Sequence, residues 1–172
     1  VKGSTLGVFG KGCLGTEVGR LAELLGMKVL YAEHRNATTC REGYTPFEEV
    51  LKQADILTLH CALTETTKNL INQETLSLCK KGAYLINTGR GPLIDEQAVC
   101  DALKSGQLGG AALDVLVKEP PKKNNPLIEL AKTMPNLIIT PHIAWASDSA
   151  VTTLTKKVTQ NIEDFVQQLN QK

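Results

Sequence analysis

The sequence predicts an α/β domain built on a doubly wound parallel sheet. Three observations support this fold class: short apolar runs alternate with segments of helical periodicity, several runs are almost continuously apolar, and glycine or proline marks many boundaries between them. Continuous apolar runs are typical of parallel strands that helices cover on both faces of a sheet. The length of 172 residues fits one domain.

The first βαβ unit is predicted at the start of the chain. An apolar run at 5–10 precedes apolar residues at helical spacing over 14–25, and Gly26 stands where a left-handed helix cap is expected. The run at 28–32 is predicted to be the second strand. Strand, helix and strand in this order form one unit of a parallel sheet.

A second helix is predicted just before the third strand. Thr45 has the side chain of an N-cap, Pro46 suits the first turn, and Glu48 suits the acidic position of a capping box. This helix leads to an apolar run at 55–59, which we interpret as the third strand.

The remaining elements continue the alternation. We expect helices at about 73–79 and 95–105, the latter closed by Gly106. Strands are expected at 83–87, 110–116 and 137–140. From Ser147 onward an apolar stripe at helical spacing predicts a long amphipathic helix; the stripe consists of Val151, Leu154, Val158, Ile162, Phe165, Val166 and Leu169.

Composition restricts the classes of partner. Lys and Arg number 19 against 18 for Asp and Glu, so the chain carries no general basic field for nucleic acid or an anionic membrane. No apolar run reaches the ~18 residues of a membrane span, and no signal-peptide pattern opens the chain. The five cysteines include no Cys-x-x-Cys pair for a metal. We expect reduced, mostly buried thiols in a cytoplasmic protein.

A glycine-rich turn predicts a dinucleotide site. The stretch 10–15, Gly-Lys-Gly-Cys-Leu-Gly, matches Gly-x-Gly-x-x-Gly and lies between the first predicted strand and helix. Gly10 permits the tight turn, Gly12 lets a pyrophosphate approach the backbone, and Gly15 allows close helix packing. The N-terminus of the helix adds amide donors and a partial positive charge. We therefore expect a Rossmann-type cofactor-binding domain.

Glu33 is the predicted ligand of the adenine ribose. It stands 18 positions after Gly15, at the end of the second strand, close to the spacing of ~20 expected for this acid. Its charge favours NAD over NADP because a carboxylate repels a 2′-phosphate. Arg35 can partly offset that repulsion or can be an ordinary exposed cation.

Three polar residues follow the last three strands. Arg90, Glu119 and His142 come after strands four, five and six, where parallel sheets bind ligands. A guanidinium can hold a carboxylate with two hydrogen bonds, and an imidazole can exchange a hydroxyl proton near neutral pH. A glutamate beside the imidazole would orient it and favour its protonated form. Taken singly, they can equally be a loop cation, a solvated acid and a packed histidine.

Asp114 interrupts the fifth apolar run. A buried carboxylate needs a partner, since an unpaired one is costly. Asp114 can therefore contact a cofactor near its nicotinamide end, or it can accept hydrogen bonds from neighbouring backbone amides.

These motifs together resemble the nucleotide-binding domain of the NAD-dependent D-2-hydroxyacid dehydrogenases. The resemblance spans nearly the whole chain and rests on the glycine turn and on the segments 59–64, 87–92, 112–115, 119–121 and 141–142. It implies that Arg90 binds the substrate carboxylate, that His142 is the acid/base and that Glu119 supports it. The cofactor contacts that it implies are Gly10, Gly12, Cys13, Leu14, Gly15, Glu33, Cys61, Thr67, Thr88 and Asp114.

Two positions depart from the family pattern. Glu33 replaces a more common aspartate, and Ala62 stands where proline is usual. The segments 31–35 and 142–147 look most like the glycerate dehydrogenase, or hydroxypyruvate reductase, members of the family. Trp145, in the second segment, can border the site or simply pack.

The resemblance also implies what surrounds the domain. In this family a substrate domain is built from residues before the nucleotide-binding domain and from the end of the chain, so the helix at about 147–172 is expected to pack toward it. A homodimer acting on a small 2-hydroxy or 2-oxo acid is expected. The alternative is a corepressor-like module that senses NAD without turnover. Relatives that act on formate resemble a pattern with glutamine beside the histidine, so Glu119 argues for hydroxy acids as substrates.

Overall fold

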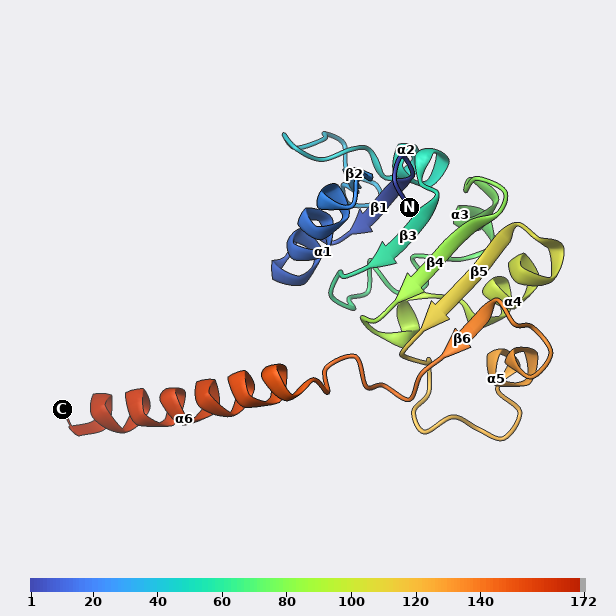
Figure 1. The fold of residues 1–172 in the computed structure, drawn as a ribbon. Coiled ribbons are helices and arrows are strands. Elements are labelled where there is room, and N and C mark those ends of the chain that lie inside the picture. The colour runs from blue at the N-terminus through green and yellow to red at the C-terminus, as the bar shows by residue number, and fades with distance from the viewer. Residues whose placement is uncertain (171–172) are drawn as a thin grey trace. The chain divides into compact units, whose positions relative to one another are not determined.

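The computed structural model describes residues 1–170, which form two compact units, Val1–Pro141 and a second that begins at His142. The first unit is a parallel sheet with flanking helices (Figure 1). Its elements in chain order are β1 (Thr5–Phe9), α1 (Cys13–Leu24), β2 (Lys28–Tyr31), α2 (Phe47–Gln53), β3 (Ile56–Leu59), α3 (Gln73–Ser77), β4 (Ala83–Asn87), the 3-10 helix η1 (Gly91–Leu93), α4 (Glu96–Ser105), β5 (Leu108–Leu113), α5 (Pro126–Ala131) and β6 (Leu137–Ile139).

The strand order creates a ligand crevice between β1 and β3. The six strands are parallel and run β2-β1-β3-β4-β5-β6 across the sheet. The sheet therefore grows in one direction from β1 to β2 and in the other from β3 onward. The loops that leave β1 and β3 diverge at this reversal, beyond the carboxyl ends of the strands. The predicted doubly wound α/β class is confirmed.

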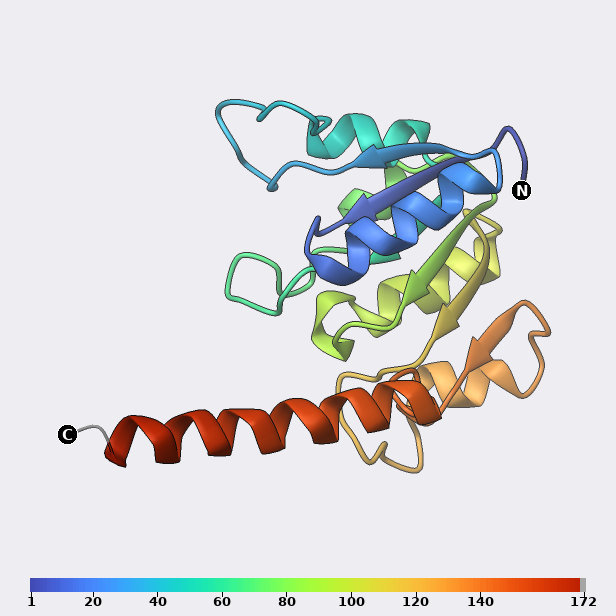
Figure 2. The same ribbon diagram turned by 60° about the vertical axis from the view of Figure 1, so that its left-hand side comes forward.

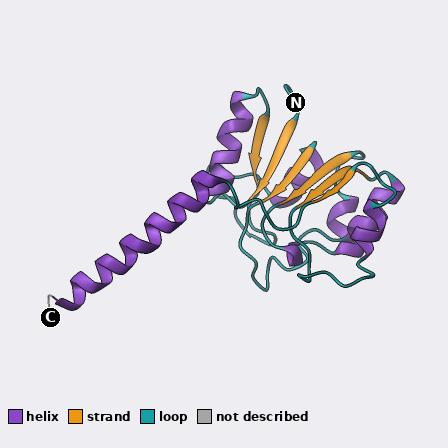
Figure 3. Ribbon diagram, turned by 60° about the horizontal axis from the view of Figure 1, so that its bottom comes forward, coloured by secondary structure: helices purple, strands orange, loops and turns teal. Residues whose placement is uncertain are grey.

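The two faces of the sheet are covered unequally. Helix α1 packs on β1 and β2, whereas α2, α3, α4 and α5 form a continuous layer on the opposite face (Figures 2 and 3). The larger core lies under that layer, with Val50, Leu85 and Val99 fully buried. On the α1 side the register places Tyr84 in line with Leu6, yet Tyr84 is exposed because α1 does not extend over β4.

Local capping explains several element boundaries. Asp95 accepts hydrogen bonds from the amides of Gln97 and Ala98 at the start of α4, and Gly106 ends that helix in the left-handed conformation. Gly26, just after α1, also has a positive φ, as predicted. Strand β4 has the predicted bounds.

The predicted start of α2 was wrong. Thr45 is not an N-cap, because its backbone pairs with Ala32 in a parallel bridge that prolongs β2. Its amide donates to the Tyr31 carbonyl and its carbonyl accepts from the Glu33 amide, both at 2.8 Å. The helix therefore begins at Phe47 after Pro46. A tertiary pairing overrides the local capping signal at this position.

Three other expectations need correction. Strand β5 ends at Leu113, so Asp114 follows the strand and does not interrupt it. The polar stretch before Pro126 contains the cap of a helix that was not predicted: the Asn125 side chain accepts from two amides at the start of α5. Cys13 and Cys40 are exposed, because they lie in the glycine turn and in the loop after β2.

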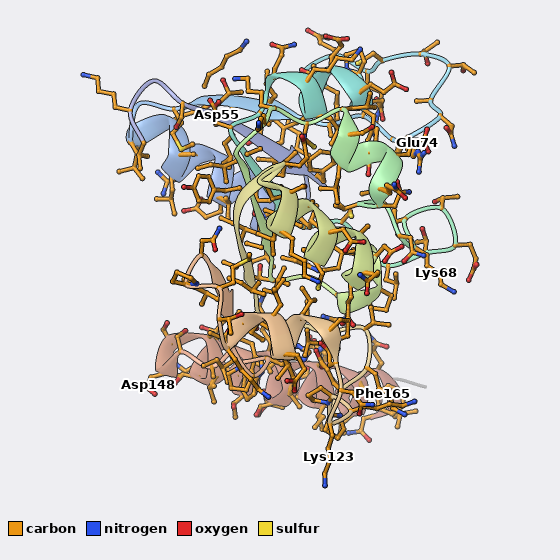
Figure 4. The ribbon with its side chains drawn as sticks, turned by 90° about the vertical axis from the view of Figure 1, so that its right-hand side faces the viewer. Asp55, Lys68, Glu74, Lys123, Asp148 and Phe165 are labelled. Carbon is orange, nitrogen blue, oxygen red and sulfur yellow. The ribbon has the colours of Figure 1, made fainter. Side chains whose placement is uncertain are left out.

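The second unit contains α6, a helix spanning Asp148–Asn170. Ser147 caps it, since its hydroxyl accepts from the Ala150 amide at 3.2 Å. The predicted apolar stripe is present and its side chains are exposed; Phe165, labelled in Figure 4, is one of them.

Candidate functional site

The glycine turn after β1 is shaped by close backbone packing. Gly10 has a φ of +107°, and a Cβ on it would lie 2.5 Å from the amide nitrogen of Cys61, the residue that follows β3 and His60. A Cβ on Gly15 would collide with the carbonyl oxygen of Gly10. Both positions therefore require glycine for the turn itself, before any ligand is considered.

Gly12 is different, because the structure leaves open space around it. A Cβ there would meet no atom within 4 Å, and Gly12 has an extended backbone conformation that other residues can adopt. It is the N-cap of α1, and no side chain caps the helix. The first turn of α1 carries Cys13 and Leu14, both exposed. This uncapped helix start beside open space fits the pyrophosphate of a dinucleotide.

A cavity of about 150 Å³ lies beside the turn, at the reversal of the strand order. The residues that line it come from the carboxyl ends of β1, β2 and β3 and from the loops that follow them. They are Phe9, Gly10, Lys11, Ala32, Glu33, His34, Arg35, Arg41, Tyr44, Phe47, Cys61, Thr66, Thr67 and Leu70. Gly10 of the glycine turn and Glu33 thus line one cavity.

Glu33 is buried and fully hydrogen-bonded. The residue is 4% exposed. Its Oε1 accepts from the His34 amide at 2.8 Å and from Arg41 Nη2 at 2.6 Å; its Oε2 accepts from the Arg41 amide at 3.0 Å and from Arg41 Nε at 2.8 Å. The Arg41 bonds, followed by the His34 amide, lower the pKa of Glu33 to about 2, so this carboxylate is charged at neutral pH.

Arg41 is the partner of Glu33 that the sequence did not reveal. Arg35 was open either to offset the charge of Glu33 or to be an ordinary exposed cation; its guanidinium pairs with Glu74 on α3 at 2.7 Å. Glu74 is labelled in Figure 4. The Arg41 guanidinium stacks 4.0 Å from the Tyr44 ring centroid. No signal in the sequence separates Arg41 from Arg35, the other arginine of the loop after β2, because the loop path decides which one reaches Glu33.

The loop after β3 forms the opposite wall of the cavity. Burial raises the pKa of the Cys61 thiol, and Cys61 lines the cavity. Burial lowers the pKa of His60, whose Nε2 lies 2.9 Å from Thr58 Oγ1. The Thr67 hydroxyl donates to the Ala62 carbonyl at 2.7 Å and so closes the loop. Two predicted cofactor contacts, Cys61 and Thr67, thus share this wall.

Arg90 lies in a loop that is anchored from the protein interior. Asn87, fully buried at the end of β4, donates its side-chain amide to the Arg90 carbonyl and accepts from the Gly89 amide, both at 3.0 Å. Thr88 and Arg90 are exposed, and Arg90 Nη1 donates to the Gly89 carbonyl at 2.8 Å. This role of Asn87 was not predicted from the sequence. Its burial next to a Gly-Arg-Gly loop is the feature that identifies it.

Asp114 and Glu119 stand in the loop that leaves β5. The buried Asp114 carboxylate accepts from the Thr140 hydroxyl at 2.5 Å, so its side chain has a partner that neither predicted alternative named. Glu119 is exposed, and its Oε1 accepts from the Leu116 amide at 2.9 Å. Glu96 holds the same loop through the amide of Val117 at 2.8 Å. Arg90, Asp114 and Glu119 thus all follow the carboxyl ends of adjacent strands of the first unit.

His142 begins the second unit and has a special backbone conformation. Its φ is +54°, which is uncommon for a residue with a side chain. Its carbonyl accepts from the indole Nε1 of the exposed Trp145 at 2.8 Å, which fixes the turn before α6. His142 is half-buried. His142 and Trp145 thus belong to one tight turn directly before α6.

Within residues 1–170 no group of three or more His, Cys, Asp or Glu side chains is arranged to hold a metal ion. No helix in the same range combines the length and the apolar character of a membrane span.

The chain matches a known protein family over most of its length. Residues 1–144 match the family described as D-isomer specific 2-hydroxyacid dehydrogenase, NAD binding domain. A Haemophilus influenzae protein whose name assigns it provisionally to the 2-hydroxyacid dehydrogenases is 83% identical over 172 residues, covering 100% of this chain and 55% of that protein. The glycerate dehydrogenase of Methylorubrum extorquens is 46% identical over 166 residues, covering 96% and 51%. The chain spans about half the length of the relatives it matches.

The chain also resembles a solved dehydrogenase structure. The D-lactate dehydrogenase of Aquifex aeolicus, in complex with NAD and lactic acid, superposes with a TM-score of 0.82 at 34% identity. The match covers 95% of this chain and 54% of that one.

Proposed function

This chain belongs to the D-isomer specific 2-hydroxyacid dehydrogenases, as their NAD-binding domain, and on this premise we propose that the protein interconverts a small 2-hydroxy acid and the corresponding 2-oxo acid. The observation that carries the proposal is the cavity at the β1–β3 crevice, bounded by the glycine turn and Glu33. The loop that presents Arg90 leaves β4, the strand next to β3. The nucleotide and the acid would therefore occupy neighbouring parts of one sheet edge.

The residues have distinct roles in this proposal. When bound, the nicotinamide cofactor supplies or accepts the hydride. Arg90 binds the substrate carboxylate through its planar guanidinium. His142 gives a proton to the substrate oxygen during reduction and removes one during oxidation, and Glu119 favours the protonated imidazole. In reduction the 2-oxo acid thus takes a hydride at carbon and a proton at oxygen, which balances the reaction.

In this proposal the pyrophosphate and the adenine ribose of the cofactor bind at the glycine turn and in the cavity beside it. The uncapped start of α1 at Gly12 binds the phosphates, and Glu33 faces the adenine ribose. The remaining contacts in this proposal are Gly10, Cys13, Leu14, Gly15, Cys61, Thr67, Thr88 and Asp114.

We propose D-glycerate and hydroxypyruvate as the substrate pair. The segments 31–35 and 142–147 and the 46% identity to a glycerate dehydrogenase support this choice. The likeness to a lactate dehydrogenase shows that the family accepts other 2-hydroxy acids, so the substrate must be measured.

The same proposal covers the surroundings of the domain. The exposed apolar stripe of α6 supports packing of the helix at about 147–172 toward a substrate domain. We further propose a homodimer in the cytoplasm. The location is supported by the cysteines, since all five lie within the described residues as free thiols.

The test is steady-state oxidation of NADH by the full-length protein, substrate domain included, with hydroxypyruvate, glyoxylate or pyruvate. We expect the highest kcat/KM with hydroxypyruvate. His142→Ala is expected to lower kcat by about 100-fold or more, the usual contribution of a general acid. Arg90→Ala is expected chiefly to raise KM. Arg20→Ala, which removes an exposed pair on α1, serves as the control. Saturable NADH binding without turnover of any 2-oxo acid would reject the enzyme in favour of a nucleotide-sensing module.

A further inference from the structure

We propose that Arg41 sets the cofactor preference of this domain. Because Arg41 balances the negative charge of Glu33, the site admits NADPH, which carries a phosphate on the adenosine 2′-oxygen, in addition to NADH. The inference rests on the proposed placement of the adenosine in the cavity beside Glu33. It concerns a residue outside every motif that marks the family in this sequence.

The first argument is the occupancy of the Glu33 carboxylate. A carboxylate offers about four acceptor positions. Each Glu33 oxygen already accepts two hydrogen bonds, three of the four in total from Arg41 and one from the His34 amide. Ribose hydroxyls, which must donate to a carboxylate in the NAD mode, would share or displace bonds made by Arg41. Glu33 paired with Arg41 therefore selects less strongly for an unphosphorylated ribose than a glutamate without such a partner would.

The second argument is the charge of the cavity. The charged residues on its lining are Lys11, Arg35 and Arg41 against the single carboxylate of Glu33. Arg35 is balanced by Glu74, which does not line the cavity. The lining therefore carries more positive than negative charge although the whole chain is nearly neutral. A 2′-phosphate brings a negative charge that such a lining attracts.

The third argument is the position of the two cations. The Arg41 guanidinium lies 4.0 Å from the Tyr44 ring centroid, and the ammonium group of Lys11 lies 5.1 Å from the same ring. Lys11 also donates to the Gly43 carbonyl at 3.3 Å. Both cations thus lie against Tyr44, a residue of the cavity lining, and Lys11 also lies 4.6 Å from the Tyr31 ring centroid. Arg41 uses Nε and Nη2 for Glu33, and the guanidinium carries five N–H donors in all.

A purely structural role for Arg41 is the competing explanation. Its side chain is 51% exposed while that of Glu33 is 3% exposed, so the pair could simply fasten the loop after β2. The two explanations differ in one measurable respect. If Arg41 only stabilises the loop, its removal changes the affinities for NADH and NADPH equally. If Arg41 sets specificity, its removal changes the ratio of the two affinities.

The experiment is fluorescence or calorimetric titration of the purified protein with NADH and with NADPH. For the natural sequence we expect the two dissociation constants to lie within about tenfold of each other. Arg41→Ala is expected to weaken NADPH by about tenfold or more, the effect of losing a charge-assisted hydrogen bond. NADH binding should stay within about threefold or tighten. Raising the salt concentration should weaken NADPH more than NADH.

Three further variants make the result specific. Arg41→Lys keeps the charge but loses the two-pronged geometry, so it should retain part of the NADPH affinity. Glu33→Gln removes the negative charge and should tighten NADPH while weakening NADH. Arg20→Ala is the matched control, since Arg20 makes the same two-pronged contact with Glu17 on α1, outside the cavity.

The outcomes separate the two proposals. Saturable NADH binding with no NADPH binding, or equal loss of both nucleotides in Arg41→Ala, overturns the role of Arg41 and leaves the proposed dinucleotide site intact. Failure of the natural sequence to bind either nucleotide overturns the dinucleotide site itself.

Discussion

Asn87 donates its buried side-chain amide to the backbone carbonyl of Arg90 at 3.0 Å, across a loop of two residues. The same side chain accepts from the Gly89 amide. The loop that carries a proposed substrate-binding arginine is therefore fixed by a polar group inside the sheet. Arg90 itself is exposed, so its backbone is held while its guanidinium is available to a ligand.

This relationship predicts the effect of Asn87→Leu. The variant keeps a similar volume but removes both hydrogen bonds and leaves the backbone groups of the loop without their partner. We expect a loss of about 1–3 kcal/mol in the free energy of unfolding, measured by urea denaturation. The affinity for a carboxylate substrate should fall as well. Asn136→Ala, which removes an exposed asparagine that also donates to a backbone carbonyl, should cost less. Equal losses in both variants would contradict the anchoring role.

The glycine turn predicts opposite results for two of its glycines. Gly12→Val should fold normally, because the structure leaves open space for the side chain, yet it should abolish NADH binding by occupying the approach to the helix N-terminus. Gly15→Ala should destabilise the fold by about 1–3 kcal/mol or more, because its methyl group meets the Gly10 carbonyl. Thermal unfolding and NADH titration of both variants separate stability from binding. Unimpaired NADH binding in Gly12→Val would contradict the assignment of the pyrophosphate.

The depressed pKa of Glu33 predicts a pH-dependent stability. The folded pKa of about 2 lies below the ordinary value of 4.5. A carboxylate with a lowered pKa in the folded state contributes stability above its ordinary pKa, and this contribution is lost as pH falls toward the folded pKa. We therefore expect Glu33→Gln to be less stable than the natural sequence at pH 7, with the difference shrinking between about pH 5 and pH 2. Urea unfolding of both proteins across this range measures the effect. A difference that does not change with pH would argue against an ionised Glu33 held by Arg41.

The cysteines predict an order of chemical reactivity. Burial raises the pKa of Cys79 to about 12, and Cys100 is also buried, so neither thiol should react with iodoacetamide in the folded protein. Cys13 and Cys40 are exposed and should react first, with Cys61 in between. Bound NADH should protect Cys13 and Cys61, which lie at the glycine turn and on the cavity wall. Peptide mapping by mass spectrometry gives the labelled fraction at each site. Equal labelling of Cys13 with and without NADH would place the nucleotide elsewhere.

Much of the fold was predictable because the relevant signals are local. Alternating apolar runs and helical periodicity follow from the covalent spacing of side chains along strands and helices. Asp95 and Gly106 cap α4 through contacts within a few residues, and the bounds of β4 could be read directly. The glycine turn was predictable for the same reason, since its pattern spans six residues between a strand and a helix.

The tertiary structure decided the features that depend on distant parts of the chain. Thr45 has the chemistry of a helix cap, but pairing with Ala32 takes its backbone groups into the sheet. Arg41 reaches Glu33 and Arg35 pairs with Glu74, and the path of the loop after β2 that allows these pairs is encoded by no short pattern.

The sequence by itself therefore determined most elements of this protein, its parallel sheet and its glycine turn. Only the tertiary structure decided which charges meet in the cavity, which carboxylate is held ionised and which asparagine fixes the Arg90 loop. The physical reason is that hydrogen bonds and ion pairs depend on distances of about 3 Å between side chains. Such distances are set by the three-dimensional path of the loops after β2 and β4, which spacing along the chain does not specify.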